Sequence, residues 1–85
     1  MSIEHYQQQL LECVGAVDIT IQSVATAAHA YTEILKAGEI SKPEYQELML
    51  DIQRKANIDS SITDLATKEK LNVAINGLIS IIGMV

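Results

Sequence analysis

The sequence contains no Phe, no Trp and only one cysteine in its 85 residues. The single cysteine, Cys13, excludes a disulfide within the chain, and a reducing compartment is the simpler setting for it. Without Phe or Trp the core has to be built mainly from Ile, Leu, Val, Ala and Met, which suits closely packed helices. A chain this short buries only about 60–65% of its unfolded surface. We therefore expect one all-α domain, residues 1–85, that gains stability by associating with a second copy or with another protein.

Basic residues are scarce: there are six, all between Lys36 and Lys70, and the formal net charge is −5. Phosphate binding needs clustered Lys and Arg, so we expect no nucleic-acid partner and no charge-driven docking on anionic lipid. The most apolar stretch, Leu71 to Val85, is interrupted by polar residues and is shorter than the roughly 20 apolar residues that cross a bilayer. No basic, apolar leader opens the chain. We therefore expect a cytoplasmic protein with no membrane span.

Apolar and small residues recur along the first part of the chain at steps of three and four. They are Ile3, Tyr6, Leu10, Cys13, Val17, Ile21, Val24, Ala28, Tyr31 and Leu35. This heptad seam predicts one long helix over residues 3–36, with Gly15 as an unfavourable residue inside it. We expect Val17, Ile21 and Val24 on the seam to contribute to an interface with a partner or a second copy.

Residues 37–41 carry the signals of a tight turn between two helices. A basic residue, an alanine and then Gly38 form a typical helix end, in which glycine takes the left-handed conformation. Ser41 and Glu44 then have the spacing of a capping box, in which each side chain accepts a hydrogen bond from the other's backbone N–H. We expect a second helix over residues 42–57 that runs back along the first one as a helical hairpin.

The helical pattern loses phase between residues 57 and 67, where Asn, Asp and Ser favour turns and Thr67 is placed to cap a final helix. We expect that helix over residues 68–83. It is apolar around nearly its whole circumference, and no charged residue follows Lys70. Such a helix needs neighbours on nearly every side. Three helices in one chain offer too few, so we expect an oligomeric helical bundle, most simply a dimer.

The last helix allows more than one interpretation. It is either the central helix of the chain's own bundle or an interface with a partner, and insertion into a membrane surface is a weaker third possibility because a basic polar face is missing. Its interface residues would be Leu71, Ile75, Leu78, Ile79 and Ile82. If they bind a partner, Ile79→Asp should unfold the protein or abolish binding. The fold class is all-α, a helical hairpin extended by a third helix.

No residue pattern predicts catalysis, a cofactor or a metal site. His29 and Glu33 stand one helical turn apart, but a stable metal site needs three or four ligands. Residues 33–44 have the central glycine and final glutamate of a calcium loop, yet lack side-chain oxygens at its third and fifth positions, and helix capping explains them without an ion. Cys13 is expected to be a buried thiol with a raised pKa. We therefore expect a non-enzymatic protein without a cofactor.

Residues 37–53 (AGEISKPEYQELMLDIQ) and 68–83 (KEKLNVAINGLISIIG) resemble accessory proteins encoded by tailed bacteriophages. Within that group the chain is most similar to the small cytoplasmic lysis-inhibition accessory proteins of T4-type phages. The resemblance implies an antiholin, which binds the cytoplasmic domain of a membrane holin and delays lysis. It transfers no individual functional residue. Two alternatives are a structural or assembly component of a phage particle and an inhibitor of a host protein.

Overall fold

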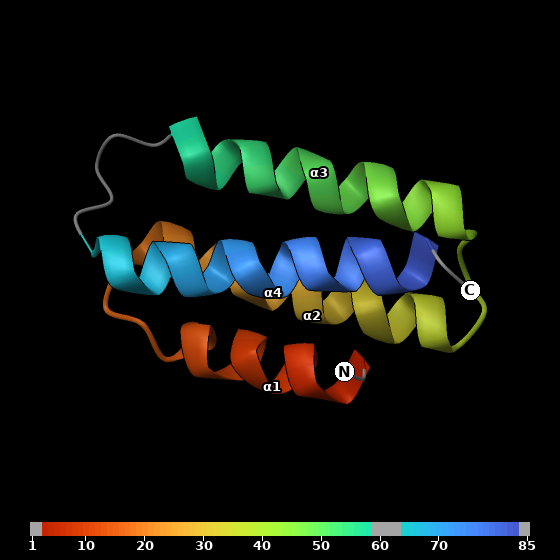
Figure 1. Ribbon diagram of the computed structural model, residues 1–85, viewed down its shortest axis with the longest axis horizontal. Helices are drawn as coiled ribbons and strands as arrows, with labels where there is room; N and C mark the ends of the chain where they lie inside the picture. The colour runs from red at the N-terminus through yellow and green to blue at the C-terminus, as the bar shows by residue number, and fades with distance from the viewer. Residues whose placement is uncertain (1–2, 59–63, 84–85) are drawn as a thin grey trace.

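The computed structural model describes residues 3–58 and 64–83, and this part of the chain contains four helices and no strand. They are α1 (Ile3–Val14), α2 (Ile19–Lys36), α3 (Lys42–Ile58) and α4 (Leu65–Gly83). Successive helices run in opposite directions along the long axis of the molecule, so α1 and α3 end, and α2 and α4 begin, at the same end of the bundle (Figure 1). The predicted all-α class and helical bundle are confirmed.

The predicted single helix over residues 3–36 is wrong, because the chain turns between α1 and α2. Asp18 has an extended backbone (φ −74°, ψ 122°), and its carboxylate accepts hydrogen bonds from the N–H groups of Thr20 at 2.9 Å and Ile21 at 3.3 Å. Asp18 is therefore the N-cap of a new helix, which the heptad spacing alone did not show. Val17 lies in the connection and is 99% exposed, so it is not on a helical seam.

The predicted turn over residues 37–41 is confirmed. Gly38 has a φ of +77°, and hydrogen bonds run from its N–H to the Leu35 carbonyl at 3.0 Å and from Glu39 N–H to the Ile34 carbonyl at 3.1 Å. This pair of bonds is the Schellman motif, which satisfies carbonyl groups at the end of α2.

The capping box that follows the turn is also present. The Ser41 N–H donates to Glu44 Oε1 at 3.0 Å, and the Glu44 N–H donates to Ser41 Oγ at 3.3 Å. The bond from the Ser41 backbone lowers the pKa of the Glu44 carboxyl, with a smaller contribution from the Ser41 side chain. Local chemistry therefore fixes the start of α3 and turns the chain back along α2.

The expected break between residues 57 and 67 corresponds to the end of α3 at Ile58 and the start of α4 at Leu65, and residues 59–63 lie outside the described part. The predicted cap at Thr67 is wrong, since Asp64 is the capping residue. Asp64 accepts from the Thr67 N–H at 3.0 Å and from Thr67 Oγ1 at 2.6 Å. These bonds, the one from the hydroxyl first, lower the pKa of the Asp64 carboxyl.

The core forms around α4, which packs against each of the other three helices. Leu71, Ala74, Ile75 and Leu78 have no exposed surface. Full burial of each Leu or Ile side chain contributes about 1.5–3 kcal/mol to folding. Most of the apolar circumference of α4 is thus covered within one chain, because the division of residues 3–36 into two helices supplies the additional neighbour.

Candidate protein-binding surface

The residues predicted to form an interface lie mostly inside the bundle. Six of them are buried, and the exposed fraction of each residue is at most 6%: Leu71, Ile75, Leu78, Ile82, Ile21 and Val24. Ile79 is half-buried against the core. A partner could reach the buried set only if the bundle opened. Val17 alone of the predicted interface residues is fully available at the surface.

A different set of apolar side chains is exposed at one end of the bundle. Val17 and Ile19 belong to the α1–α2 connection and the first turn of α2, Ile58 ends α3 and Leu65 begins α4. Their exposed fractions are 99%, 76%, 80% and 67%, respectively. The elements that carry them meet at the end opposite the α2–α3 turn (Figure 1). We call Val17, Ile19, Ile58 and Leu65 the end surface.

Three of these four positions could not be predicted from the spacing of apolar residues. Ile19, Ile58 and Leu65 fall at helix ends, where the three-and-four spacing of apolar residues no longer indicates which side faces the core. The available signal was Asp18, whose N-cap chemistry would have placed its neighbours Val17 and Ile19 at a helix end. Large apolar side chains at helix ends are often buried by a neighbouring segment, and here they are not.

An ion pair joins α1 to α4 behind the end surface. Lys70 Nζ lies 2.7 Å from Glu12 Oε2. The hydrogen bond to Glu12 raises the pKa of the Lys70 ammonium. Cys13, the next residue in α1, is 1% exposed, and burial raises the pKa of its thiol although the charge of Lys70 acts in the opposite direction. A buried thiol that stays protonated is a poor nucleophile, so Cys13 contributes to packing and not to covalent chemistry.

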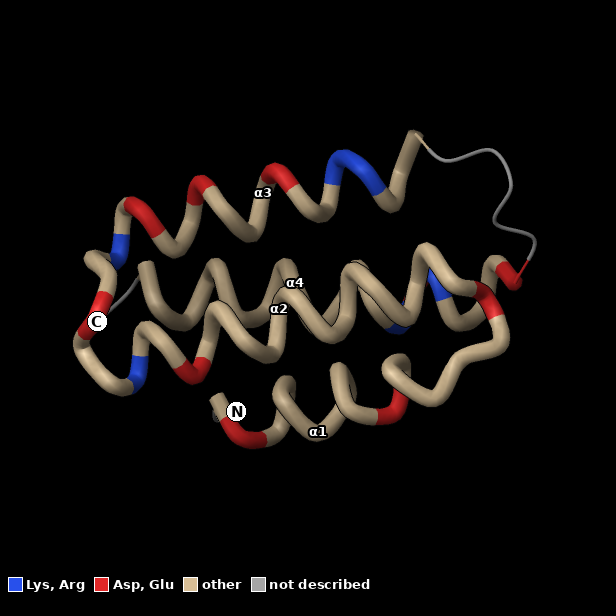
Figure 2. The backbone as a smooth tube through the Cα atoms, turned by 180° about the vertical axis from the view of Figure 1, so that it is seen from behind, with Lys and Arg blue, Asp and Glu red and all other residues tan. Residues whose placement is uncertain are grey.

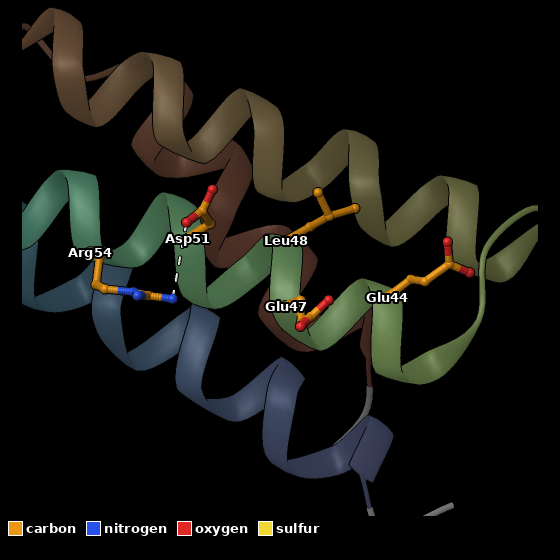
Figure 3. A pocket seen from close by; sticks show the side chains of 5 residues that line it. All are labelled: Glu44, Glu47, Leu48, Asp51 and Arg54. Carbon is orange, nitrogen blue, oxygen red and sulfur yellow. Dashed lines mark ion pairs between the residues drawn. The ribbon is translucent and has the colours of Figure 1, made fainter.

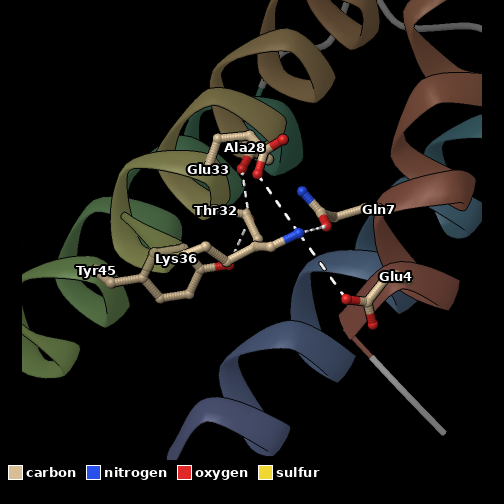
Figure 4. Close-up of polar contacts among 7 residues, drawn as sticks. All are labelled: Glu4, Gln7, Ala28, Thr32, Glu33, Lys36 and Tyr45. Atoms are coloured by element: carbon tan, nitrogen blue, oxygen red, sulfur yellow. Dashed lines mark hydrogen bonds and ion pairs between the residues drawn. The ribbon is translucent and has the colours of Figure 1, made fainter. Parts of the chain in front are cut away.

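Polar side chains at the opposite half of the bundle link helices to each other. Thr32 Oγ1 donates to the Ala28 carbonyl at 2.8 Å and lies 2.8 Å from the Tyr45 hydroxyl (Figure 4). Because the threonine proton is directed to Ala28, the Tyr45 hydroxyl donates to Thr32. Both residues have no exposed surface, and burial raises the pKa of Tyr45. This satisfied pair fixes α3 against α2.

Lys36 connects the end of α2 to the start of α1. Its Nζ lies 3.1 Å from Gln7 Oε1, which accepts a hydrogen bond, and within 3.5 Å of Glu33 and 3.9 Å of Glu4 (Figure 4). Gln7 is 6% exposed, so the lysine supplies a partner for a buried amide oxygen. The arrangement is a structural contact between helices.

An open hollow of about 420 Å³ lies along the outer side of α3. It is lined by Glu44, Glu47, Leu48, Asp51 and Arg54 (Figure 3). The Glu44 carboxylate already caps α3, and Asp51 pairs with Arg54 at 4.0 Å. Two of the three carboxylates of the hollow therefore already have partners within the chain.

The described residues contain neither a metal-ion cluster nor a membrane-spanning helix. Within residues 3–58 and 64–83, no three His, Cys, Asp or Glu side chains come together as a metal-ion site. None of the helices in the same ranges has the length and apolar character required to cross a membrane. What the described surface does offer is a set of exposed apolar side chains at one end.

The chain matches no protein-family model, and neither a curated protein nor a solved structure is significantly similar to it.

Proposed function

We propose that this chain is a non-enzymatic regulatory protein that binds another protein through the end surface. The observation that carries the proposal is the exposure of four large apolar side chains at one end of a bundle whose core is otherwise closed. Isolated exposed apolar residues are ordinary, whereas several gathered from three helices at one site are typical of protein contact surfaces.

The burial of α4 determines how such a protein would act. Opening the bundle to expose Leu71, Ile75 and Leu78 would remove the main apolar contacts of the fold, at about 1.5–3 kcal/mol for each side chain. Binding through the end surface leaves that core intact. Val17 and Ile58 would then be the residues that bury most surface on binding, because they are the most exposed.

The resemblance to lysis-inhibition accessory proteins favours the cytoplasmic domain of a phage holin as the partner. In the structure, the two segments that carry the resemblance form the α2–α3 turn with most of α3, and nearly all of α4. These segments build the scaffold. The proposed role is therefore that of a cytoplasmic antiholin. The segments that carry the resemblance form its helical scaffold, and its contact residues lie at the end surface.

Calorimetric titration of the purified cytoplasmic domain of a T4-type holin into this protein tests the proposal. The wild-type chain should bind, and Val17→Asp and Leu65→Asp should each weaken binding by about tenfold or more, since each places a charge in an apolar contact. Val73→Asp is the matched control, because Val73 is 49% exposed in the middle of α4.

Circular dichroism spectra should show that all three variants keep the helical content of the wild type. If the wild-type chain does not bind the holin domain, the antiholin role is rejected. If it binds and the end-surface variants bind equally well, the role stands but the end surface is the wrong site.

A further inference from the structure

The outward face of α2 carries no Asp, Glu, Lys or Arg from Ile19 to Thr32, and Glu33 is the first charged residue on it. Ile19, Ser23, Thr26 and Ala30 are exposed there, and Ala27 and Ile34 are half-buried at its border. We call these six residues the α2 face. Together with Val14 of α1, the α2 face borders an open groove of about 530 Å³ whose lining is Val14, Gln22, Ser23, Thr26, Ala27 and Ala30.

Two of the polar side chains of the groove have hydrogen-bond partners within the chain. Thr26 Oγ1 donates to the Gln22 carbonyl at 2.8 Å, and Gln22 Nε2 donates to the Ala16 carbonyl at 3.1 Å. Thr26 can therefore lose contact with water without leaving its hydroxyl proton unpaired. Leu11, one helical turn before Val14 on α1, is 48% exposed and adds apolar surface on that side. The groove thus has an uncharged lining of mostly small side chains.

Charge decides which partner fits this surface. The protein carries a net charge of −5, and a two-fold axis brings every patch against a copy of itself. Glu44, Glu47 and Asp51 outnumber Arg54 on the outward side of α3, so a two-fold pairing there would oppose like charges at some positions (Figure 2). The six residues of the α2 face would meet no like charge in a two-fold pairing. Glu33 lies at the edge of this face, and its Oε2 is 3.5 Å from Lys36 Nζ. A second copy of this acidic chain can approach the α2 face without repulsion.

The order of residue sizes on the α2 face is self-complementary. An antiparallel pairing centred between Thr26 and Ala27 places Ser23 opposite Ala30 of the second copy and Ile19 opposite Ile34 of the second copy. Small residues at the centre allow helix axes to approach to roughly 8 Å, the lower end of the usual range. The larger isoleucines then fill the space where the two helices diverge.

We propose that the α2 face and its groove bind a second copy of this chain in an antiparallel, two-fold dimer. This surface differs from the apolar faces that predicted a dimer from sequence, most of which are buried within one chain. The inference is independent of the proposed holin partner. Ile19 belongs to both the α2 face and the end surface, so the tests of the two surfaces use other residues. The dimer carries its two end surfaces at opposite ends.

Two pairs of substitutions test the antiparallel register. Ser23→Glu with Ala30→Glu places like charges opposite each other across the proposed interface, whereas Ser23→Glu with Ala30→Lys places opposite charges there. Both positions are exposed within the single chain, so neither pair disturbs the core. Ala66→Glu with Ser80→Glu, at exposed positions of α4, is the matched control for added negative charge.

Light scattering after size exclusion gives the mass of each variant across a dilution series. We expect the wild type, the α4 control and the Glu/Lys pair to have twice the mass of the 9.3 kDa chain, and the Glu/Glu pair to dissociate at a concentration at least about tenfold higher. A wild type that stays a monomer at about 1 mM would overturn the proposal. Assembly beyond a dimer, or a Glu/Glu pair with the wild-type dissociation constant, would overturn it as well.

Discussion

The ring of Tyr6 in α1 lies where the Cβ atom of residue 77 would stand in α4, and only glycine leaves that space open. Tyr6 also meets the ring of His5 edge to face, with ring centroids 5.3 Å apart. Glycine within a helix costs about 1 kcal/mol relative to alanine. At Gly77 this cost is offset by close packing of α1 against α4, a relationship between distant residues that no local pattern in the sequence reveals.

Gly77→Ala should lower the free energy of unfolding by about 1 kcal/mol, because overpacking of about 1–3 kcal/mol exceeds the gain in helix propensity. In a Tyr6→Ala background the same substitution should instead raise it by up to about 1 kcal/mol. Urea unfolding of the four proteins of this cycle measures the coupling. Equal effects of Gly77→Ala in both backgrounds would show that Tyr6 does not occupy this space.

Tyr45→Phe should destabilise the protein by about 1 kcal/mol, because it removes the buried hydroxyl that donates to Thr32. Combining it with Thr32→Val should cost less than the sum of the two single substitutions. Since burial raises the pKa of Tyr45 above its unfolded value of 10.0, the contribution of the neutral phenol is complete below that pH and is lost as the pH rises through the folded pKa. Alkaline unfolding of Tyr45→Phe should therefore be shallower than that of the wild type.

Asp18→Ala should reduce the free energy of unfolding by about 0.5–2 kcal/mol, because the N–H groups of Thr20 and Ile21 lose their acceptor. Asp18→Asn keeps a side-chain oxygen at the same place and should retain most of the stability. Thermal unfolding followed by circular dichroism distinguishes the two variants. If Asp18→Ala leaves the free energy of unfolding unchanged, the chain does not turn at this residue.

The thiol of Cys13 should react with an aromatic disulfide reagent only when the protein unfolds. Its residue is 1% exposed, and burial raises the pKa of the thiol, so both access and thiolate concentration are low in the native state. The rate of thiol release should rise in step with the fraction unfolded as urea is added. Rapid reaction in the absence of urea would contradict the packing of α1 against the rest of the bundle.

Asp64 should contribute to loss of stability in acid. Hydrogen bonds from Thr67 lower its pKa below the ordinary value of 3.8, so its contribution is present above that pH and is lost as the pH falls through the folded pKa. Asp64→Asn should make the loss of stability below about pH 4 shallower. Urea unfolding at a series of acidic pH values measures this slope, and Asp59→Asn is a control of the same charge change.

Features fixed by neighbouring residues could be predicted from the sequence, and those fixed by distant contacts could not. The turn at Gly38 and the capping box of Ser41 and Glu44 are local, and both were found in the expected place. The seam over residues 3–36 failed because spacing alone took no account of the cap at Asp18. That error also led to the expectation that α4 had too few neighbours within one chain.

The candidate binding surface likewise depends on contacts between distant residues, which the sequence could not predict. An apolar α4 was recognised correctly, but sequence could not decide between burial within the chain and burial against a partner. The answer depends on how many helices surround α4, and the structure supplies three. Ile58 and Leu65 became candidates only when the fold placed their helix ends beside the connection that carries Val17 (Figure 1).

Native-state hydrogen exchange of the isolated chain tests the central claim, that α4 is the core of a single chain and not a surface kept for a partner. The amides from Leu71 to Leu78 should exchange most slowly, with a free energy of opening equal to the global free energy of unfolding. Exchange of these amides through a smaller opening, while α2 and α3 remain protected, would contradict the claim and return α4 to the role of a binding helix.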